Sequence, residues 1–406
     1  MRGKSIWIFN HYAITPDLPG GTRHFEIGQS LVEKGFNVTI FASSFNSTAR
    51  SDKLDKGRFK LEKIKHNFNF VWVKTVHYRK NDIRRILNML SFAFRLYKIS
   101  KMLVKENILS KPDVIIGSTV HPFTPVVGIL LAKVFSSAFI FEIRDLWPQT
   151  FIDMGLWTSR SIASRFFYFI ERFTVARADH IIVLSPKTIY YLAERYGINK
   201  KDITYLPNGV NLQSFKFSNN ERKENSFKIL YIGALNKTNN LDVLIEAAHI
   251  LKSNANDKNV VINIYGDGKE KNKLKTIKDS YMLNNVHFMG YVNKDDVPKI
   301  ISEHNVLFIS TGKVYYGSEN KLYEYLASGR PVIFSVWSRH NDLSKIGAGL
   351  YASPDDPLAV ASAILRLKNM DERERQLMGM KGRRFVEKYH DWNILASRLE
   401  KILKNI

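Results

Sequence analysis

Apolar positions along this chain follow two patterns that alternate from beginning to end. Short runs of consecutive apolar residues, typical of buried parallel strands, alternate with segments in which apolar residues recur every three or four positions, as in amphipathic helices. In the first half, strands are predicted at Ser5–Asn10, Asn37–Ala42, Val71–Thr75, Val114–Gly117, Phe139–Ile143 and His180–Leu184. Helices are predicted at Thr22–Lys34, Ile83–Lys105, Thr124–Phe135, Ser159–Ala178 and Pro186–Tyr196.

A second alternating set begins after the polar run Ser218–Ser226, whose composition is typical of a linker. Its predicted strands are Lys228–Gly233, Val260–Tyr265, Val286–Phe288, Val306–Ile309 and Pro331–Phe334. Its predicted helices are Leu241–Ser253, Glu270–Asp279, Lys294–Ile301, Lys321–Ala327, Pro357–Leu367 and Glu372–Tyr389. Strands that alternate with helices indicate βαβ units. We therefore expect an α/β fold of two Rossmann-like, doubly wound parallel-sheet domains, with ligands bound in an interdomain cleft.

The chain is strongly basic, with 61 Lys and Arg against 38 Asp and Glu and a formal net charge of +23. This excess is concentrated, since residues 56–111 contain 15 basic and 3 acidic side chains. Such a charge indicates an anionic partner or surface. The absence of cysteine excludes disulfides, thiolate catalysis and cysteine metal sites, and it suits a reducing cytoplasm.

Two apolar segments could be mistaken for targeting or membrane sequences. The first residues contain too short an apolar run for a signal peptide and are better explained as a buried strand. The segment Pro122–Phe141 could just span a bilayer. Its internal Pro125, Lys133 and Ser136 favour a buried helix followed by a buried strand.

Three groups of residues in the first half follow predicted strands and are candidates for a site. Gly20 and Gly21 precede a helix, where glycines let a backbone approach an anion, although a simple turn with a helix cap explains them equally well. His121 can present its imidazole at a strand end, or it can be structural. Arg144 and Asp145 can face the cleft, or they can form a structural ion pair.

The second half has its own candidates at strand ends. Lys237 can reach a diphosphate as a point charge. The loop Gly290, Tyr291 and Val292 can offer backbone amides and carbonyls to a flat base.

The strongest pattern is the segment Gly317–Val332, which has the form loop, helix, glycine stop and buried strand. Asn320 and Lys321 stand at the helix N-terminus, where backbone N–H groups and a lysine favour an anion. Glu324 lies one turn further, where a carboxylate can accept hydrogen bonds from the hydroxyls of a ribose. Together they indicate a site for a nucleoside diphosphate. No Walker A motif, D-x-D motif or paired-histidine motif is present, so we expect no catalytic metal.

The motifs together resemble the retaining GT-B glycosyltransferases of family 4, in particular the WbuB-like branch of bacterial surface-polysaccharide transferases. The resemblance covers nearly the whole chain. It rests on the early Gly-Gly loop, Arg144–Pro148, Glu171–Asp179, Pro207–Asn211, Gly290–Val292 and Lys321–Val332. It implies an acceptor-binding domain at residues 1–205, a donor-binding domain at residues 206–389, and a helix at about 390–406 that packs back on the first domain.

The resemblance also assigns roles to residues. It implies that Gly20 and Gly21 contact the donor phosphate and that His121 lies beside the transferred sugar. Lys237 and the start of the next helix, with Asn320, Lys321 and Leu322, would hold the diphosphate, and Glu324 would hold the ribose. His121, Lys237 and Lys321 are thus the expected catalytic residues. The implied chemistry is front-face substitution, for which positioning and leaving-group stabilisation suffice.

Two positions depart from the family pattern. Ala234 stands where members usually carry an arginine, and Tyr316 stands where the first of two glutamates is usual. Glu319 lies close by in sequence, but nothing in the sequence shows that it replaces the missing glutamate.

The basic segment Asn81–Lys105 predicts an amphipathic helix with a wide apolar face flanked by cations. Arg84, Arg85, Lys98 and Lys101 could bind an anionic membrane surface. The alternative is an ordinary Rossmann-layer helix with a solvated basic edge.

Sequence therefore predicts a metal-independent hexosyltransferase at the inner face of the cytoplasmic membrane. It would move a sugar, such as an N-acetylated amino sugar, from a nucleotide sugar such as a UDP-sugar to a lipid-linked saccharide in O-antigen or capsule synthesis, with no cofactor. The alternatives are a nucleotide-sugar epimerase of GT-B fold and a basic nucleic-acid-binding protein. The second lacks an RNA-binding motif or zinc spacing, so no nucleic-acid partner is expected.

Overall fold

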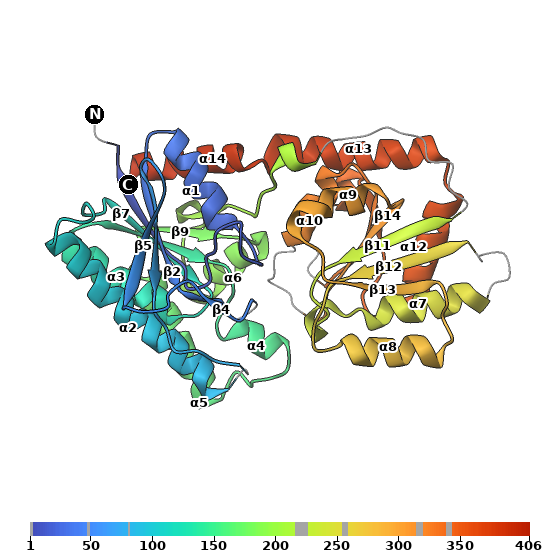
Figure 1. Cartoon of the computed structure of the whole chain (residues 1–406), viewed down its shortest axis with the longest axis horizontal. Coiled ribbons are helices and arrows are strands. Elements are labelled where there is room, and N and C mark those ends of the chain that lie inside the picture. Colours follow the sequence, from blue (N-terminus) through green and yellow to red (C-terminus); the bar gives the residue numbers. More distant parts are fainter. Residues whose placement is uncertain are drawn as a thin grey trace. The chain divides into compact units, whose positions relative to one another are not determined.

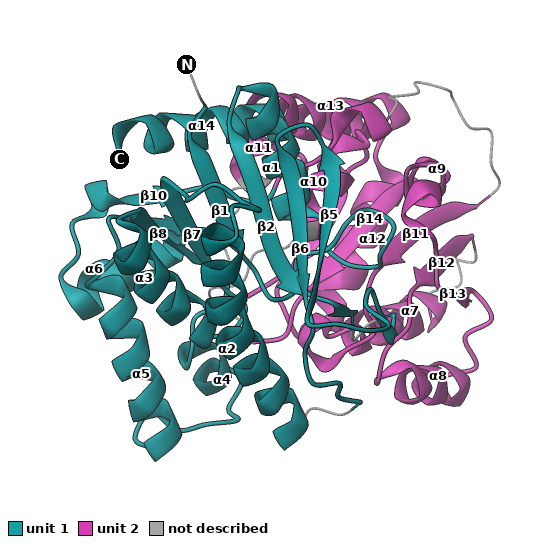
Figure 2. Ribbon diagram, turned by 60° about the vertical axis from the view of Figure 1, so that its left-hand side comes forward, with its two compact units in different colours: residues 1–208, 316–318, 392–406 teal, residues 209–315, 319–391 magenta. Residues whose placement is uncertain are grey.

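The computed structural model describes residues 3–46, 49–79, 82–215, 226–253, 259–313, 320–337 and 343–406. The chain divides into two compact units, coloured separately in Figure 2. The first unit contains residues 1–208 and 392–406, and the second contains residues 209–315 and 319–391.

The described part of the first unit is built on an eight-stranded sheet with the order β10-β9-β8-β7-β1-β2-β6-β5. Neighbouring strands are parallel except for the β5–β6 pair at one edge. The strands are β1 (Ser5–Phe9), β2 (Asn37–Ser43), β5 (Phe59–Lys65), β6 (Phe68–Val73), β7 (Val114–Thr119), β8 (Ala138–Ile143), β9 (His180–Val183) and β10 (Ile203–Tyr205). A short hairpin, β3 (Phe45–Asn46) and β4 (Ser51–Asp52), lies outside this sheet.

Alternating side chains of β1 separate the two faces of this sheet. Ile6 and Ile8 belong to the core beneath α1 (Arg23–Glu33) and α14 (Trp392–Asn405). Trp7 and Phe9 belong to the core on the other face. The helices of that face include α2 (Ile83–Lys105), α3 (Phe123–Phe135) and α6 (Pro186–Tyr196). The first unit also contains α4 (Gln149–Asp153), α5 (Ile162–Val175) and the short η1 (Lys200–Asp202). Figure 1 shows α1 and α14 together, apart from α2 and α3.

The second unit repeats the architecture with a parallel six-stranded sheet in the order β13-β12-β11-β14-β15-β16. Its strands are β11 (Phe227–Ile232), β12 (Val260–Tyr265), β13 (Val286–Gly290), β14 (Val306–Ser310), β15 (Val332–Ser335) and β16 (Gly349–Tyr351). Its helices are η2 (Leu212–Ser214), η3 (Lys237–Asn239), α7 (Asp242–Ser253), α8 (Lys271–Ser280), η4 (Lys294–Asp296), α9 (Val297–Ser302), α10 (Asn320–Ala327), α11 (Leu343–Ile346), α12 (Pro357–Asn369) and α13 (Glu372–Tyr389). The core beneath α7 and α12 is separate from the core beneath α10 and α13.

The strand orders place a topological switch point in each sheet. β1 lies between β7 and β2, and β11 lies between β12 and β14. Crossovers leave in opposite directions from such a strand, so the loops at its carboxyl end diverge and leave room for a ligand. Candidate sites are therefore expected beyond β1 and beyond β11.

The C-terminal helix α14 packs on α1, within the first unit. The Lys4 ammonium donates hydrogen bonds to the carbonyls of Leu403 and Ile406, each at 2.8 Å. The expected doubly wound sheets are confirmed, and the segment Pro122–Phe141 forms α3 and the start of β8. No helix among the described ranges has both the length and the apolar character needed to cross a membrane.

A buried ionic network fastens the start of α1 to the middle of the first unit. The Glu142 carboxylate on β8 accepts from Arg23 at 2.9 Å and pairs with the His24 ring at 2.7 Å. Arg23 also donates to the carbonyls of Leu206 and Pro207, at the end of the unit. Burial alone would raise the pKa of Glu142, but His24 and Arg23 hold this pKa well below its ordinary value. Glu142 is therefore charged at neutral pH.

We predict that Glu142→Gln destabilises the first unit by about 3–5 kcal/mol, because it leaves Arg23 buried without its counter-charge. Urea unfolding followed by tryptophan fluorescence measures the loss, since Trp7, Trp72, Trp147, Trp157 and Trp392 belong to this unit. Glu33→Gln is the control, because its ion pair with Lys65 is solvent-exposed. Equal midpoints for the two variants would contradict the importance of the network.

Candidate active site

The first unit contains a cavity of about 400 Å³ beyond the carboxyl end of β1. Its walls include His11 after β1, Gly20 and Gly21 before α1, Arg85 of α2, and Arg144 after β8. These segments are distant in sequence, and the parallel sheet brings their ends to one edge. The cavity therefore collects three of the predicted site residues, Gly20, Gly21 and Arg144.

The Gly-Gly loop is shaped by a close contact and a positive dihedral angle. Gly20 has φ +140°, and a Cβ atom there would lie 2.8 Å from the Cδ1 atom of Ile14. Position 21 has open space around its Cα atom. A side chain at position 20 would therefore be strained, while the backbone at position 21 can be approached closely.

Two histidines lie at one side of the cavity, the second buried behind the first. The His11 Nδ1 atom is 2.9 Å from the His121 Nε2 atom, and the Thr124 hydroxyl is 3.2 Å from the same Nε2 atom. His11 lines the cavity, whereas His121 is fully buried behind it. Burial lowers the pKa of His11 to about 3 and holds the pKa of His121 well below its ordinary value, so both rings are neutral. Direct contact of His121 with a sugar stays a prediction, and His11 is the residue that the sequence did not reveal.

Arg144 and Asp145 leave β8 in different surroundings. Thr119 joins them to β7, because its hydroxyl accepts a hydrogen bond from the Arg144 backbone N–H at 3.0 Å and donates to the Asp145 carbonyl at 3.2 Å. The Arg144 residue is half-buried and lines the cavity, while Asp145 is exposed. Of the two charged residues that follow β8, Arg144 lines the cavity and Asp145 does not.

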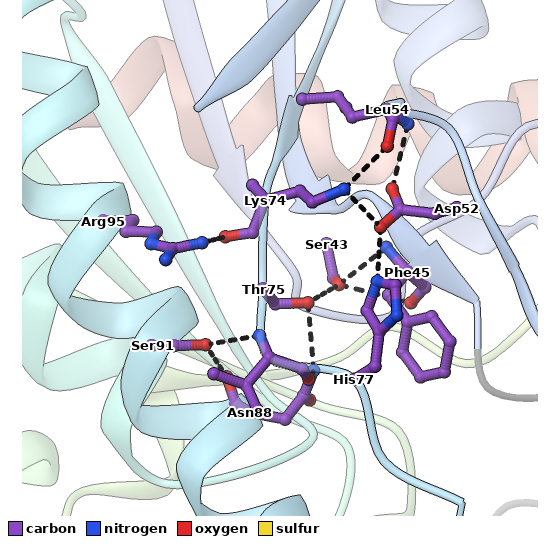
Figure 3. A network of polar contacts seen from close by, with 11 residues as sticks. Ser43, Phe45, Asp52, Leu54, Lys74, Thr75, His77, Asn88, Ser91 and Arg95 are labelled. Carbon is purple, nitrogen blue, oxygen red and sulfur yellow. Dashed lines mark hydrogen bonds and ion pairs between the residues drawn. The ribbon is translucent and has the colours of Figure 1, made fainter. Parts of the chain in front are cut away.

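A polar network holds α2 against the cavity-lining residue Ser43 (Figure 3). The Ser43 and Thr75 hydroxyls are 2.7 Å apart, and the buried Asn88 amide donates to the Thr75 hydroxyl at 3.0 Å and to the Val76 carbonyl at 2.7 Å. Further along the helix, Arg95 donates to the Lys74 carbonyl at 2.7 Å. The start of α2 is therefore tied to β2 and to the segment that follows β6.

The basic residues of α2 fall on different faces. Arg84, Lys98 and Lys101 are exposed, which a membrane-facing helix and a solvated basic edge both predict. Arg85 differs from the expectation, because it is half-buried and lines the cavity. With 3.6 residues per turn, position 85 lies on the same side as the buried Asn88. Its charge is therefore part of the cavity and not of the exposed face.

In the second unit, glycines and a lysine meet beyond β11. A Cβ atom at Gly266 would lie 1.8 Å from the Gly233 carbonyl oxygen, and one at Gly233 would lie 1.7 Å from the Lys321 Nζ atom. Both positions have positive φ angles, so glycine is required on two grounds. Lys321 donates a hydrogen bond to the Tyr231 hydroxyl at 3.1 Å. The ammonium therefore lies at the carboxyl edge of this sheet.

Glu324 follows Lys321 by one turn of α10, and both residues are half-buried. Burial lowers the pKa of Lys321 to about 8, an effect that Glu324 partly offsets. Burial raises the pKa of Glu324, and the charges of Lys294 and Lys321 act in the opposite direction. A cation and a carboxylate one turn apart can accommodate a phosphate and a neighbouring diol.

The remaining predicted donor residues lie after β11, at the end of β13 and in α10. Lys237 is exposed in η3. Gly290 ends β13, and its carbonyl accepts a hydrogen bond from the Gly266 N–H at 2.7 Å. Of the next two residues, Tyr291 is exposed and Val292 is half-buried. Leu322 is buried in the core, so only its backbone can contact a ligand.

The structure leaves three positions of the donor pattern open. α10 begins at Asn320, but the Asn320 side chain lies outside the described part of the chain, as do residues Tyr316 and Glu319. The roles of these residues stay predictions.

Comparison with known proteins follows the same division of the chain. Residues 20–214 match Glycosyltransferase Family 4, and residues 226–369 match Glycosyl transferases group 1. Sucrose-phosphate synthase from Thermosynechococcus elongatus superposes with a TM-score of 0.77 at 17% identity, covering 99% of this chain and 98% of that chain. The protein has the GT-B fold of family 4 and group 1 glycosyltransferases.

Other GT-B structures agree over their full lengths. HepE of Anabaena in complex with UDP-glucose has a TM-score of 0.69 at 13% identity and covers 99% of this chain and 100% of its own. WaaG, a glycosyltransferase involved in lipopolysaccharide biosynthesis, has a TM-score of 0.68 at 14% identity and covers 98% and 99%. Identities this low show the fold.

A curated relative is similar over part of this GT-B chain. An uncharacterized glycosyltransferase of Methanocaldococcus jannaschii is 20% identical over 243 residues. The match spans 58% of this chain and 61% of the relative, less than two thirds of its length.

The lowered pKa of Lys321 predicts pH-dependent binding of a nucleoside diphosphate to this GT-B chain. The ammonium loses its charge as pH rises through about 8, so UDP affinity should fall between about pH 7 and pH 9. Calorimetric titration with UDP measures this fall. Lys321→Arg keeps its charge throughout and should remove the dependence. Identical pH profiles for the two proteins would contradict the placement of Lys321 at the phosphates.

Proposed function

We propose that the protein is a retaining, metal-independent hexosyltransferase that moves a sugar from a nucleoside diphosphate sugar to a lipid-linked saccharide. The observation that carries this proposal is the group formed by Lys321, Glu324, Gly233 and Gly266 at the switch point of the second sheet. A diphosphate needs cations and close backbone approach, and a ribose needs a carboxylate nearby. The group provides a cation and a carboxylate one turn apart on α10, beside two loops whose glycines let the Lys321 ammonium and the backbone pack closely.

The donor is proposed to be a UDP-sugar, such as an N-acetylated amino sugar, and no cofactor is needed. The complex of HepE with UDP-glucose supports a uridine donor for a chain of this fold. Lys237 and the α10 N-terminus would neutralise the leaving diphosphate, which is the charge that develops in glycosyl transfer. In the first unit, Gly20 and Gly21 would contact the donor phosphate, and the buried His121 would lie beside the transferred sugar.

The acceptor is proposed to be attached to a lipid, because the first unit exposes two apolar helix faces. On α2, Ile83, Leu87, Leu90 and Phe94 share one exposed face, and Phe94 is 61% exposed. The Lys98 ammonium lies 4.2 Å from the Phe94 ring centroid, so a basic residue borders the apolar face. Apolar side chains bordered by cations suit the surface of an anionic bilayer.

Helix α5 repeats the arrangement. Ile162, Phe166 and Phe169 are exposed at helical spacing, with the exposed Arg165 and Arg172 beside them. α3 packs against both α2 and α5, so the two faces belong to one layer of helices (Figure 1). This supports a peripheral position on the inner face of the cytoplasmic membrane and, with the lipopolysaccharide role of WaaG, a part in O-antigen or capsule synthesis.

Glu324→Ala tests the donor assignment. It should weaken UDP binding by about 1.5–3 kcal/mol, the range for hydrogen bonds to a charged group. Calorimetry measures the affinity for UDP. Release of free UDP from UDP-sugars in excess EDTA measures the activity, and this release separates a transferase from an epimerase of the same fold. Glu303→Ala, an exchange of the same type at the end of α9, is the control. Undiminished UDP affinity in a folded Glu324→Ala variant would remove the ribose contact.

The membrane assignment is tested by sedimentation with vesicles of anionic phospholipid. At about 1 kcal/mol per basic residue, replacing Arg84, Lys98 and Lys101 by Gln should weaken vesicle binding roughly 100-fold. Replacing the exposed Lys269, Lys275 and Lys299 of the second unit by Gln removes the same charge and should have little effect on vesicle binding. Equal losses in the two triple variants would show that net charge alone, and not the α2 face, drives binding.

A further inference from the structure

The cavity of the first unit is lined by two positive charges and no negative one. Among its described lining residues, the charged side chains are Arg85 and Arg144, and none of the others is a carboxylate. The His11 ring on the same wall is neutral, because burial lowers its pKa to about 3. The charges of both arginines also act on the neighbouring Asp145, which does not line the cavity. Two guanidinium groups that line one cavity suit an anionic ligand better than a neutral sugar.

The rest of the cavity wall is suited to a small sugar-bearing ligand. Tyr12, Phe45, Trp72 and Tyr78 contribute aromatic rings, and Ser43 contributes a hydroxyl. The volume of about 400 Å³ lies within the range of small-molecule sites. The cavity therefore combines faces on which a sugar ring can pack with guanidinium groups that bind oxyanions in a bidentate manner.

Both arginines stand on backbone that is already fixed. The Asp82 side chain caps α2 by accepting from the Arg84 N–H at 2.9 Å, and Asn88 is held one turn later by Thr75 and Val76. The Arg144 backbone N–H donates to the Thr119 hydroxyl. Because the backbone is fixed, only side-chain freedom is lost when the guanidinium groups bind a ligand, which favours a specific site over loose attraction.

The position of Arg85 on α2 indicates which anion the cavity takes. The outer face of the same helix turns carries the exposed Ile83, Leu87 and Leu90. An acceptor with its lipid at this face and its sugar in the cavity would have its linking group beside Arg85. In a lipid-linked saccharide that link is a phosphate or a diphosphate.

We infer that Arg85 and Arg144 form a binding site for the phosphate or diphosphate that joins the acceptor sugar to its lipid. The inference rests on the proposed transferase function and deepens it, because it names the acceptor group that the first unit recognises. Gly20 and Gly21, which line the same cavity, stay the predicted donor-phosphate contacts of the first unit. The two arginines are assigned to a different phosphate, that of the acceptor.

Titration with butyl diphosphate tests the site, in the presence of saturating UDP so that the donor site of the second unit is filled. Arg85→Gln and Arg144→Gln should each weaken butyl diphosphate binding about 10- to 100-fold, as expected for charge-assisted hydrogen bonds. Arg84→Gln, which removes the same charge from the exposed face one residue away, should bind it as the unchanged protein does. Arg85→Lys keeps the charge but not the planar set of donors, so its affinity for butyl diphosphate should lie between those of Arg85→Gln and the unchanged protein.

Two outcomes would overturn the inference. Equal butyl diphosphate affinities for the Arg84→Gln, Arg85→Gln and Arg144→Gln variants would show that the arginines of the cavity do not bind the group. Tighter binding of glucuronic acid than of butyl diphosphate, lost in Arg85→Gln, would assign the cavity to an acidic sugar instead. UDP binding, measured first in the same samples, separates these outcomes from failure of the proposed function, since a chain that binds no UDP has no donor site.

Discussion

The parallel alignment of strands is the constraint on which both candidate sites depend. Because every strand of the second sheet, and all but one edge strand of the first, runs in the same direction, residues far apart in sequence leave their strands at a common edge. His11 and Arg144 meet at one cavity in this way, although more than 130 residues separate them. Gly233, Gly266 and Gly290 approach one another at the other sheet for the same reason.

Helix α2 connects the chemistry of the first unit to its surface. On its inward face Asn88 is held by hydrogen bonds and Arg85 lines the cavity, while its outward face exposes large apolar side chains. If the protein has the proposed lipid-linked acceptor, such a helix would bring the lipid-attached group to the cavity while its outer face stays at the bilayer. The basic residues of segment 56–111 thus divide between an exposed face, with Arg84, Lys98 and Lys101, and the cavity, with Arg85.

Sequence patterns predicted most of this fold, because strands buried on both faces and amphipathic helices have distinct periodicities. α2, α6, α13 and β12 occur at the predicted bounds. The edge strand β5 was missed, since Phe59–Lys65 contains four charged residues, two of them adjacent, and is more exposed than the buried strands. His11 and the inward orientation of Arg85 were also missed. Both depend on which segments meet in space, and neither residue stands in a motif.

Hydrogen–deuterium exchange with and without UDP-glucose tests the central claim most directly, namely that the carboxyl edge of the second sheet holds the nucleotide. A bound nucleotide slows exchange of the backbone amides that it contacts or covers, and amides away from it keep their exchange rates. The account predicts slower exchange on adding UDP-glucose at residues 233–237, at Gly290–Val292 and at the first turn of α10. Protection confined to the first unit, with none at these segments, would contradict it.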